Sequence, residues 1–342
     1  MNDVTAHPSA IWWAVPHAHL RFRGDEVVVG APESADHVAL PAVTGVRLWE
    51  ALHTGGTLVM LADTSTMPID EVVSCVRALV VAGIVTDTPS ESSSIAFHDA
   101  LMHARSRGRT DEGFGQRTGA PAHREPRQGT VVALPAIAPD DLHRDAPFAD
   151  VVGSRTTARS WSTDDLTLGQ LAEFLWRAGH AGADEPGHLP YPYAGPVDCH
   201  VIAVAAGRID GLAPALYTYG SRDHALRAVT PLPTRETGRL PIGDYLSTVA
   251  RGERVGERHP PALMLVLSDL GMMASAYDGI AYANILKTTG VILGTASLSA
   301  TAMGLGSTIL GLANGDDFTD IYGASLPHLR STGELALGVP QR

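Results

Sequence analysis

The sequence predicts an α+β protein made of two folded domains, and three observations support this. The chain has 342 residues, which suits two domains of about 100–200 residues each. Hydrophobic residues make up 44% and charged residues 18%, a balance that supports buried cores. Segments with the apolar spacing of helices alternate with short apolar runs that are typical of buried strands. We therefore expect a small domain in residues 1–90, a connector in residues 91–147 and a larger domain in residues 148–342.

The predicted small domain begins with a β-hairpin over residues 20–30, where a Gly-Asp turn precedes an arm of β-branched residues. Residues 46–52 have helical spacing. Pro68 then opens a second helix, which ends at Gly83 before a short strand over residues 84–86. A hairpin, two helices and a returning strand resemble a winged-helix-like module.

The charge of this small domain bears on its partners. Residues 1–90 contain four arginines against ten acidic residues, a formal charge of −6, and the whole chain carries −12. Such a surface repels phosphates, so we expect no nucleic-acid partner. Two interpretations remain open: a module that binds a peptide or protein, and a domain that only packs or dimerises.

The predicted larger domain combines helices and strands. Its first helix is amphipathic, its two central strand candidates are apolar, and its longest helix is rich in Ala, Gly, Ser and Thr. Such small residues allow close approach, so we expect the long helix at the centre of the domain or of a dimer, with a kink near Gly290 and Gly294. In chain order the elements are helix 166–179, strand 199–205, strand 263–267, helix 281–302 and strand 334–338.

The composition also limits the compartment and the kinds of site. No apolar run approaches the roughly 18 residues of a membrane span, and the first residues lack the layout of a signal peptide. Cys75 and Cys199 are the two cysteines, too few for a disulfide framework or a Cys-rich metal site. His98 and His103 lie five residues apart, which does not place them on one helix face. We expect a cytoplasmic protein with no membrane segment and no metal.

One lysine, Lys287, stands among the 25 basic residues, and the others are arginines. This bias is typical of a GC-rich genome. Its consequence is chemical, because any mechanism that needs a lysine has a single candidate in this chain.

The first motif is Arg155, Thr156, Thr157 and Arg159 at the start of the larger domain. Two guanidinium groups four residues apart, with hydroxyls between them, suit a dianionic phosphate. The alternative is a solvated pair of arginines that caps nearby structure.

The second motif is the run Pro-Tyr-Pro-Tyr-Ala-Gly-Pro over residues 190–196, directly before an apolar strand. Three prolines and a glycine fix an irregular backbone whose N–H and C=O groups can face a ligand. The alternative is a rigid turn with no ligand.

The third motif is the glycine-rich stretch over residues 302–311. It follows a helix rather than a strand, so it does not meet the requirements of a dinucleotide-binding or P-loop motif. Its glycines allow a flat ring to approach closely. The alternative is a helix C-cap followed by a tight turn.

In this order the three motifs resemble those of the flavin-dependent nitroreductase-like fold. More closely, residues 97–342 resemble the SagB-type dehydrogenases, the thiazoline and oxazoline oxidases of ribosomal peptide biosynthesis. The similar segments are FHDALMHARSRGRTDEGFG (97–115), GLAPALYTY (211–219) and GIAYANILKTTGVILGTASLSATAMGLGSTILG (279–311).

The resemblance implies an intertwined homodimer with a mixed sheet flanked by helices, FMN at the dimer interface, and a modified precursor peptide and a cyclodehydratase as partners. It assigns the first motif to the FMN phosphate and ribityl chain, the second to the border of the isoalloxazine, and the third to a second cofactor turn. The family usually has Ser at the position of Tyr193. The implied cofactor-binding residues are Arg155, Thr156, Thr157, Arg159, Pro192, Tyr193, Ala194, Gly195, Gly306, Ser307 and Gly311.

The chain departs from this family at its catalytic pair. The azoline oxidases have Lys-Tyr shortly before the long helix, whereas this chain has Ala276 and Tyr277. Tyrosine, with an ordinary pKa of about 10, is a poor base at neutral pH without a neighbouring cation. Lys287 matches a different lysine of the family, within the long helix. Tyr277 is therefore expected to be a base or an orienting residue, and the alternative is an aromatic residue that only lines the cleft.

Three functions follow from these observations. The first is an FMN-dependent dehydrogenase that oxidises a modified peptide, with hydride passing to flavin. The second is an NAD(P)H-dependent nitro or flavin reductase. The third is a non-catalytic scaffold of a peptide-modifying complex.

Overall fold

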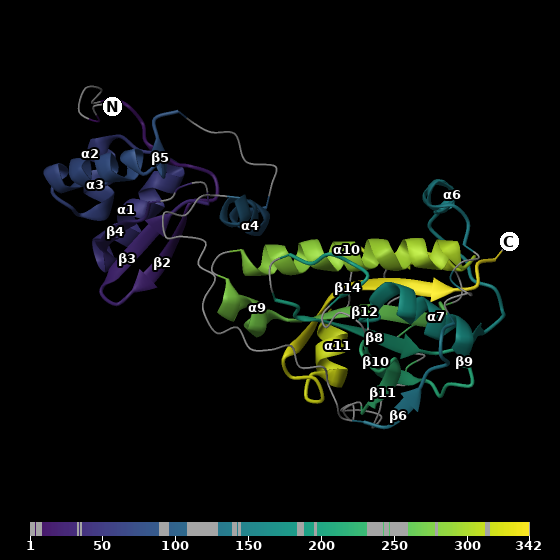
Figure 1. The fold of residues 1–342 in the computed structure, drawn as a ribbon. Helices are drawn as coiled ribbons and strands as arrows, with labels where there is room; N and C mark the ends of the chain where they lie inside the picture. The colour runs from purple at the N-terminus through teal and green to yellow at the C-terminus, as the bar shows by residue number, and fades with distance from the viewer. Residues whose placement is uncertain are drawn as a thin grey trace. The chain divides into compact units, whose positions relative to one another are not determined.

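The structure is a computed structural model of the chain, which divides into two compact units, Met1–Phe114 and Gly115–Arg342 (Figure 1). It describes residues 9–32, 36–88, 96–107, 129–138, 145–182, 188–194, 197–230, 259–277, 280–311 and 315–341, together with Val4, Ser34, Leu142, Ile242 and Leu246. No helix among these residues is long and apolar enough to cross a lipid bilayer.

The N-terminal unit combines helices with a three-stranded antiparallel sheet of order β2-β3-β4. The strands are β2 (His19–Arg23), β3 (Glu26–Gly30) and β4 (Val38–Pro41), and a second small sheet pairs β1 (Trp13–Ala14) with β5 (Val85–Thr86). The helices are α1 (Ala42–Thr54), α2 (Leu58–Ser65), α3 (Ile69–Val81) and α4 (Phe97–Arg107).

Local signals explain where the helices of this unit begin and end. Pro68 precedes α3, and Gly83, with a φ of 68°, follows its end, as the sequence predicts. The sequence prediction omitted α2, which starts where the Thr57 side chain accepts a hydrogen bond from the N–H of Met60. The apolar faces of α1, α2 and α3 enclose one core, which includes Val27, Val29, Leu48, Leu52, Leu61, Val72, Val76 and Leu79.

The C-terminal unit is built on a seven-stranded sheet of order β13-β14-β12-β8-β10-β11-β6. Its strands are β6 (Val131–Ala133), β8 (His200–Ala206), β10 (Ala215–Gly220), β11 (Ala225–Val229), β12 (Ala262–Asp269), β13 (Gly306–Ile309) and β14 (Leu329–Gly338). All neighbours in this sheet pair antiparallel. In the described part of the unit, the parallel pairings expected of a mixed sheet are confined to β7 (Leu166–Thr167) with β9 (Ile209–Asp210) and to a bridge between Thr157 and Ser307.

Helices cover both faces of this sheet. On one face lie α7 (Leu168–Gly179) and α10 (Ala281–Ala302), which pack on alternate residues of β8, β12 and β14. On the other face lies α11 (Gly315–Tyr322), where Phe318 and Tyr322 pack against the remaining residues of the same strands. Every residue of β8 is therefore buried, which is why it reads as a continuous apolar run. Two shorter helices, α6 (Phe148–Ser154) and α9 (Leu270–Ala276), complete the unit.

Helix α10 is the longest element and runs without interruption over its 22 residues (Figure 1). The kink expected near Gly290 and Gly294 is absent. A Cβ at either glycine would meet no atom within 4 Å, so neither marks a site of close packing within the chain. The segment expected as a connector also contains regular structure, because α4 and β6 both lie within residues 91–147.

Candidate functional site

A hollow of about 420 Å³ lies at the C-terminal end of α10, beside strand β13. Two of the sequence motifs meet there, the arginine motif and the glycine-rich stretch. Thr301, Pro340 and Gln341 also line it, and no sequence signal pointed to the last two. The lining residues are Ser154, Thr156, Thr157, Ala158, Arg159, Ser160, Thr301, Gly304, Leu305, Gly306, Pro340 and Gln341.

Backbone pairing brings the two motifs together. The N–H of Ala158 donates to the carbonyl of Ser307 over 3.0 Å, and Thr157 forms a parallel bridge with Ser307. The hydroxyl of Thr308 donates to the carbonyl of Ala158. Residues 157–158 therefore extend the edge of the sheet beyond β13. The Ser307 hydroxyl, itself buried, lies 3.2 Å from that of Ser297, which connects this edge to α10.

Glycine at position 306 makes this approach possible. A Cβ there would lie 2.8 Å from the Cβ of Ala158 and 3.2 Å from the Cζ3 of Trp161. The glycine-rich stretch also contains the helix C-cap that the sequence allowed, because Gly304, with a φ of 69°, follows the end of α10. The N–H of Gly304 donates to the carbonyl of Thr301, and the N–H of Leu305 donates to the carbonyl of Ala300.

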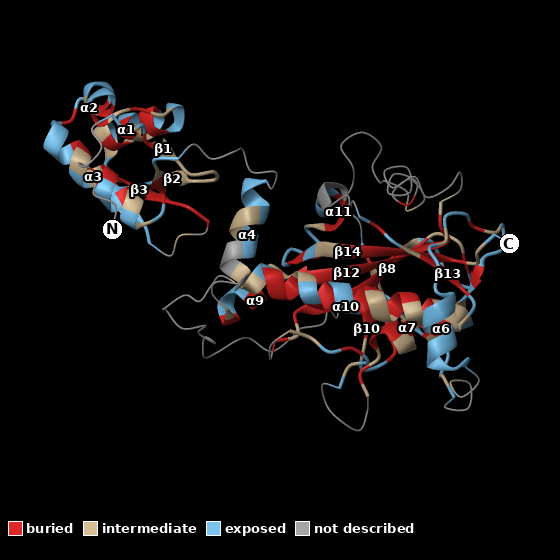
Figure 2. Cartoon of the chain, turned by 90° about the horizontal axis from the view of Figure 1, so that it is seen from above, coloured by how far each residue is buried: buried red, intermediate tan, exposed pale blue. Residues whose placement is uncertain are grey.

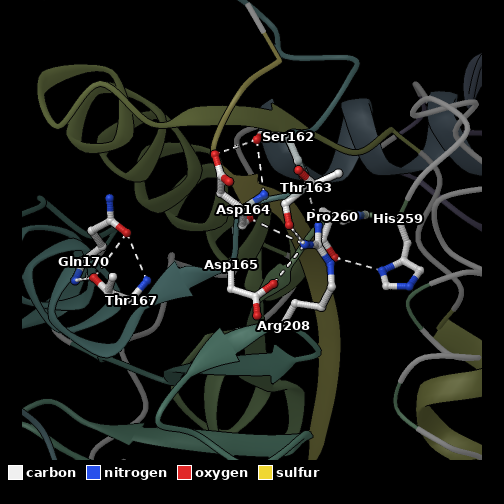
Figure 3. A network of polar contacts seen from close by, with 9 residues as sticks. All are labelled: Ser162, Thr163, Asp164, Asp165, Thr167, Gln170, Arg208, His259 and Pro260. Atoms are coloured by element: carbon white, nitrogen blue, oxygen red, sulfur yellow. Dashed lines mark hydrogen bonds and ion pairs between the residues drawn. The ribbon is translucent and has the colours of Figure 1, made fainter.

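Arg208 binds residues 162–165, the segment that follows the arginine motif in the chain (Figure 3). Its Nη1 donates to the carbonyl of Thr163 and to Oδ1 of Asp165, each over 3.0 Å. Its own backbone N–H donates to the carbonyl of Pro261, at the start of β12. The chain is thereby fixed to the sheet within a few residues of the arginine motif. In the same view, Thr167 and Gln170 form the capping box that starts α7.

The hollow is suited to an anion. Arg159 lines it, and both Arg155 and Arg159 are exposed and form no ion pair with any described residue. Thr156, Thr157 and Ser160, which carry hydroxyl groups, also line the hollow. Among the described lining residues there is no carboxylate. Guanidinium and hydroxyl donors without a competing anion are the groups that bind phosphate.

The Pro-Tyr turn lies elsewhere along α10. The N–H of Ala194 donates over 3.0 Å to the hydroxyl of Thr288, and Tyr191 is 5% exposed within the sheet's main core. Pro192 and Tyr193 lie between these two anchors, and Gly195 is outside the described residues. Thr288 and Thr301 are 13 residues apart on the helix, which corresponds to about 20 Å of helix axis. Within one chain, the turn and the hollow are therefore two separate places.

Gly311 does not reach the hollow. It follows the end of β13 and is exposed, five residues beyond Gly306, which is roughly 16 Å of extended chain. Lys287, on the exposed face of α10, precedes the Thr288 that anchors the turn.

Tyr277 follows the end of α9 and packs against a small apolar cluster at the N-terminal part of α10. The members of this cluster are Val197, Cys199, Met272, Met273, Ala276 and Ile285. Burial raises the pKa of the Tyr277 hydroxyl, so the group is protonated at neutral pH. Burial also raises the pKa of the Cys199 thiol to about 12, which leaves it without thiolate character.

A family comparison identifies this arrangement. The model described as "Nitroreductase family" matches residues 152–339, more than half of the chain, and the match includes the hollow's main walls, the turn and Tyr277. The chain belongs to the nitroreductase family. It is therefore a flavin-dependent oxidoreductase, and its cofactor is FMN.

Solved structures show the same fold. A protein assigned as a nitroreductase from Ralstonia eutropha JMP134 is 19% identical, with a TM-score of 0.50, over 67% of this chain and 98% of its own. Another from Anabaena variabilis ATCC 29413 is 17% identical, with a TM-score of 0.53, over 74% of this chain and 50% of its own. A chain of the E. coli microcin synthetase McbBCD complex with truncated pro-MccB17 bound is 12% identical, with a TM-score of 0.48, over 74% of this chain and 85% of its own. The chain has no match among curated protein sequences.

The hollow of this nitroreductase-family chain fits one end of FMN. Its guanidinium and hydroxyl groups suit the phosphate, and the bare Cα of Gly306 keeps the wall close to the arginine motif.

Proposed function

We propose that this protein is a SagB-type dehydrogenase, which oxidises an azoline ring in a modified precursor peptide to an azole. The observation that carries the proposal is the arrangement around the N-terminal part of α10. Thr288 anchors the turn that bears Tyr193, and the apolar cluster against which Tyr277 packs includes Ile285, one helical turn earlier. The Tyr277 phenol and the turn that we expect to border the flavin are thus both held by the N-terminal part of α10.

The reaction removes two electrons and two protons from the ring. One ring carbon loses a C–H bond as hydride, its neighbour loses a proton, and a C=C bond forms between them. FMN, when bound, accepts the hydride. Because its raised pKa keeps Tyr277 protonated, this residue donates a hydrogen bond that orients the ring, and the proton leaves to water. Tyr277 therefore acts as an orienting residue rather than as the base.

We assign the cofactor contacts to two places in the chain, the hollow beside β13 and the Pro-Tyr turn. We assign the phosphate and ribityl chain to Thr156, Thr157 and Arg159, which line the hollow together with Gly306. Arg155 and Ser307 are not lining residues in this structure; each is next to one in the chain, and we assign them to the same end of the cofactor. Pro192, Tyr193, Ala194 and Gly195 border the isoalloxazine. We assign no contact to Gly311 in this hollow, because it lies beyond the end of β13.

A homodimer would explain how the hollow and the Pro-Tyr turn, which lie far apart within one chain, can hold the same cofactor. The exposed side of α10 carries Lys287, Gly290 and Val291, and its two glycines leave open space where side chains would stand. A second copy packed on this side would bring one chain's turn towards the other chain's hollow. Further partners in this proposal are the precursor peptide and the cyclodehydratase that forms its azoline.

Rapid mixing of the FMN-loaded protein with two reductants tests the proposal. Under anaerobic conditions, an azoline-containing peptide is expected to bleach the flavin absorbance and to lose the mass of two hydrogens. NADPH without peptide is expected to bleach it far more slowly. Fast bleaching by NADPH, with no reaction of the peptide, would instead establish the NAD(P)H-dependent reductase.

A further inference from the structure

The N-terminal unit has an apolar helix face that its own core does not use. On α2, Val59 is 61% exposed and Met60 is 57% exposed, although the neighbouring Leu58 and Leu61 are buried. Figure 2 shows this helix with exposed residues beside the buried ones. Adjacent large apolar side chains that face solvent commonly mark a surface for a partner.

A hollow lies on each flank of α2. One, of about 550 Å³, is lined by Val59, Ala62, Asp63, Thr66, Met67 and Ile69. The other, of about 270 Å³, is lined by Glu50, Ala51, Thr54, Gly55, Gly56, Met60, Leu61 and Thr64. At 100° per residue, the α2 residues of the first hollow point away from those of the second, so the two hollows occupy opposite flanks.

One carboxylate lines each hollow beside apolar side chains. Asp63 lines the first and Glu50 the second, and both are exposed and form no ion pair with a described residue. The nearby cation, Arg47, donates to the hydroxyl of Thr66 over 3.3 Å. The excess of acidic residues in this unit, a formal charge of −6 over residues 1–90, extends the same negative field.

We propose that this face of α2 binds a peptide segment that carries lysine or arginine beside apolar side chains. The apolar side chains would enter the two hollows, and the cations would pair with Glu50 and Asp63. An α-helix is about 10 Å across, so the two apolar anchors must be about that far apart, roughly seven residues in a helical peptide. The negative field excludes nucleic acid from the same face.

This surface gives the N-terminal unit a role in substrate capture, and that role rests on the proposed function. A peptide-oxidising enzyme must hold a flexible chain while one ring reaches the flavin. A docking segment on the peptide, remote from the ring, raises the effective concentration of the ring at the site.

Fluorescence anisotropy of the full-length, FMN-loaded protein tests the surface directly. The probe is a labelled peptide of four Leu-Lys-Lys-Leu units, with a peptide of four Leu-Glu-Glu-Leu units as its counterpart. The lysine peptide is expected to bind and the glutamate peptide is not. The double variant Glu50→Lys with Asp63→Lys should weaken binding about tenfold, because two attractions become repulsions.

A matched control separates the surface from net charge. The double variant Asp25→Lys with Asp87→Lys makes the same charge change at exposed positions away from the α2 hollows, and it should alter binding less than twofold. Val59→Ser with Met60→Ser should weaken binding without any charge change. Equal losses in both charge-reversed variants, or no binding of the lysine peptide, would overturn the inference.

The proposed function fails in a different way. If azoline peptides of any sequence leave the flavin oxidised while the lysine peptide still binds α2, the dehydrogenase assignment is wrong and the docking surface stands.

Discussion

Ala276 and Tyr277 decide how the proton leaves the substrate in our account. In the proposed SagB-type assignment, the position of the azoline oxidases' lysine is occupied by Ala276, which has no exposed surface. Tyr277 then has no cation of that kind beside it, and burial raises its pKa above the ordinary value of about 10. In that assignment the phenol is present, and the neighbouring lysine that would make it a base is absent from the sequence.

The pH dependence of peptide oxidation tests this role of Tyr277. A tyrosine base would make the rate rise about tenfold per pH unit up to its raised pKa, because the tyrosinate fraction rises in that way. As an orienting donor, Tyr277 should give a rate that is flat between about pH 7 and pH 9. Tyr277→Phe should lower kcat/KM roughly two- to tenfold, the worth of one neutral hydrogen bond, with an unchanged profile.

Tyr282→Phe is the control, because Tyr282 is 48% exposed on the first turn of α10. It should leave the rate unchanged. A steep rise in the wild-type rate towards pH 9, abolished in Tyr277→Phe, would show that Tyr277 is the base after all.

A lysine at position 276 should destabilise the fold. Ala276 lies inside the apolar cluster with Met273 and Ile285, so Ala276→Lys forces a long cationic side chain into a packed, dry space. We expect a loss of several kcal/mol of unfolding free energy, read as a lower thermal midpoint. Ala274→Lys, at an exposed position of α9, should leave the midpoint nearly unchanged. Equal stability of the two variants would contradict this packing argument.

At the scale of elements, the end of α7 packs against the β10–β11 hairpin through aromatic rings. Trp176 stacks on His180 with ring centroids 3.5 Å apart, and His224 meets the same Trp176 edge-on at 5.1 Å. Tyr219 lies 2.8 Å from Nδ1 of His224, whose Nε2 is 3.2 Å from the carbonyl of Pro135. A neutral imidazole that carries its proton on Nε2 satisfies both contacts.

This junction makes stability depend on pH. Burial lowers the pKa of both His180 and His224. The folded state therefore binds fewer protons than the unfolded chain, whose histidines titrate near pH 6.5, and the unfolding free energy falls as the pH drops below that value. We expect a lower thermal midpoint at pH 5.5 than at pH 7.5. His224→Asn should reduce this difference, because it removes one of the two titrating groups. Asn is the chosen replacement because it tolerates the positive φ of 46° at this position.

His103→Asn, at an exposed site on α4, serves as the control and should keep the full difference. Identical pH dependence in the wild type and in His224→Asn would show that the junction does not titrate.

The elements with strong periodicity could be predicted from the sequence, and the short ones could not. Helix α10 has the predicted bounds, and β8, β12 and α3 lie within a few residues of theirs. Strands β6 and β13 have three and four residues, and their structure depends on pairing with β11 and β14 rather than on local pattern. The prediction of a kink in α10 was wrong, because glycine permits a bend without requiring one.

The same distinction holds for the candidate site. The arginine motif and the glycine-rich stretch could be found because each has an unusual local composition. Their meeting depends on the backbone pairing of Thr157 and Ala158 with Ser307, a contact over about 150 residues that no local pattern encodes. Pro340 and Gln341 line the hollow only because β14 ends beside it.

In our proposal the functional molecule is a homodimer, because the turn and the hollow are far apart within one chain. With a chain mass of 36.0 kDa, light scattering should give twice that mass, about 72 kDa. Val291→Glu should shift the protein towards the monomer, because Val291 is 36% exposed on the side of α10 that we assign to the dimer. Val131→Glu, at 56% exposure on the edge strand β6, is the control. A wild-type mass of one chain would contradict the shared site.

Uptake of FMN is the decisive measurement, because the hollow at β13 must hold the cofactor phosphate for any of the proposed chemistry. Titration of the flavin-free protein, followed by quenching of FMN fluorescence, should show binding that Arg159→Ala weakens roughly 10- to 100-fold, the worth of a charge-assisted hydrogen bond. Arg23→Ala, at an exposed arginine of the N-terminal unit, should leave the affinity unchanged. If Arg159→Ala binds FMN as tightly as the wild type, the phosphate lies elsewhere and our assignment of the hollow is wrong.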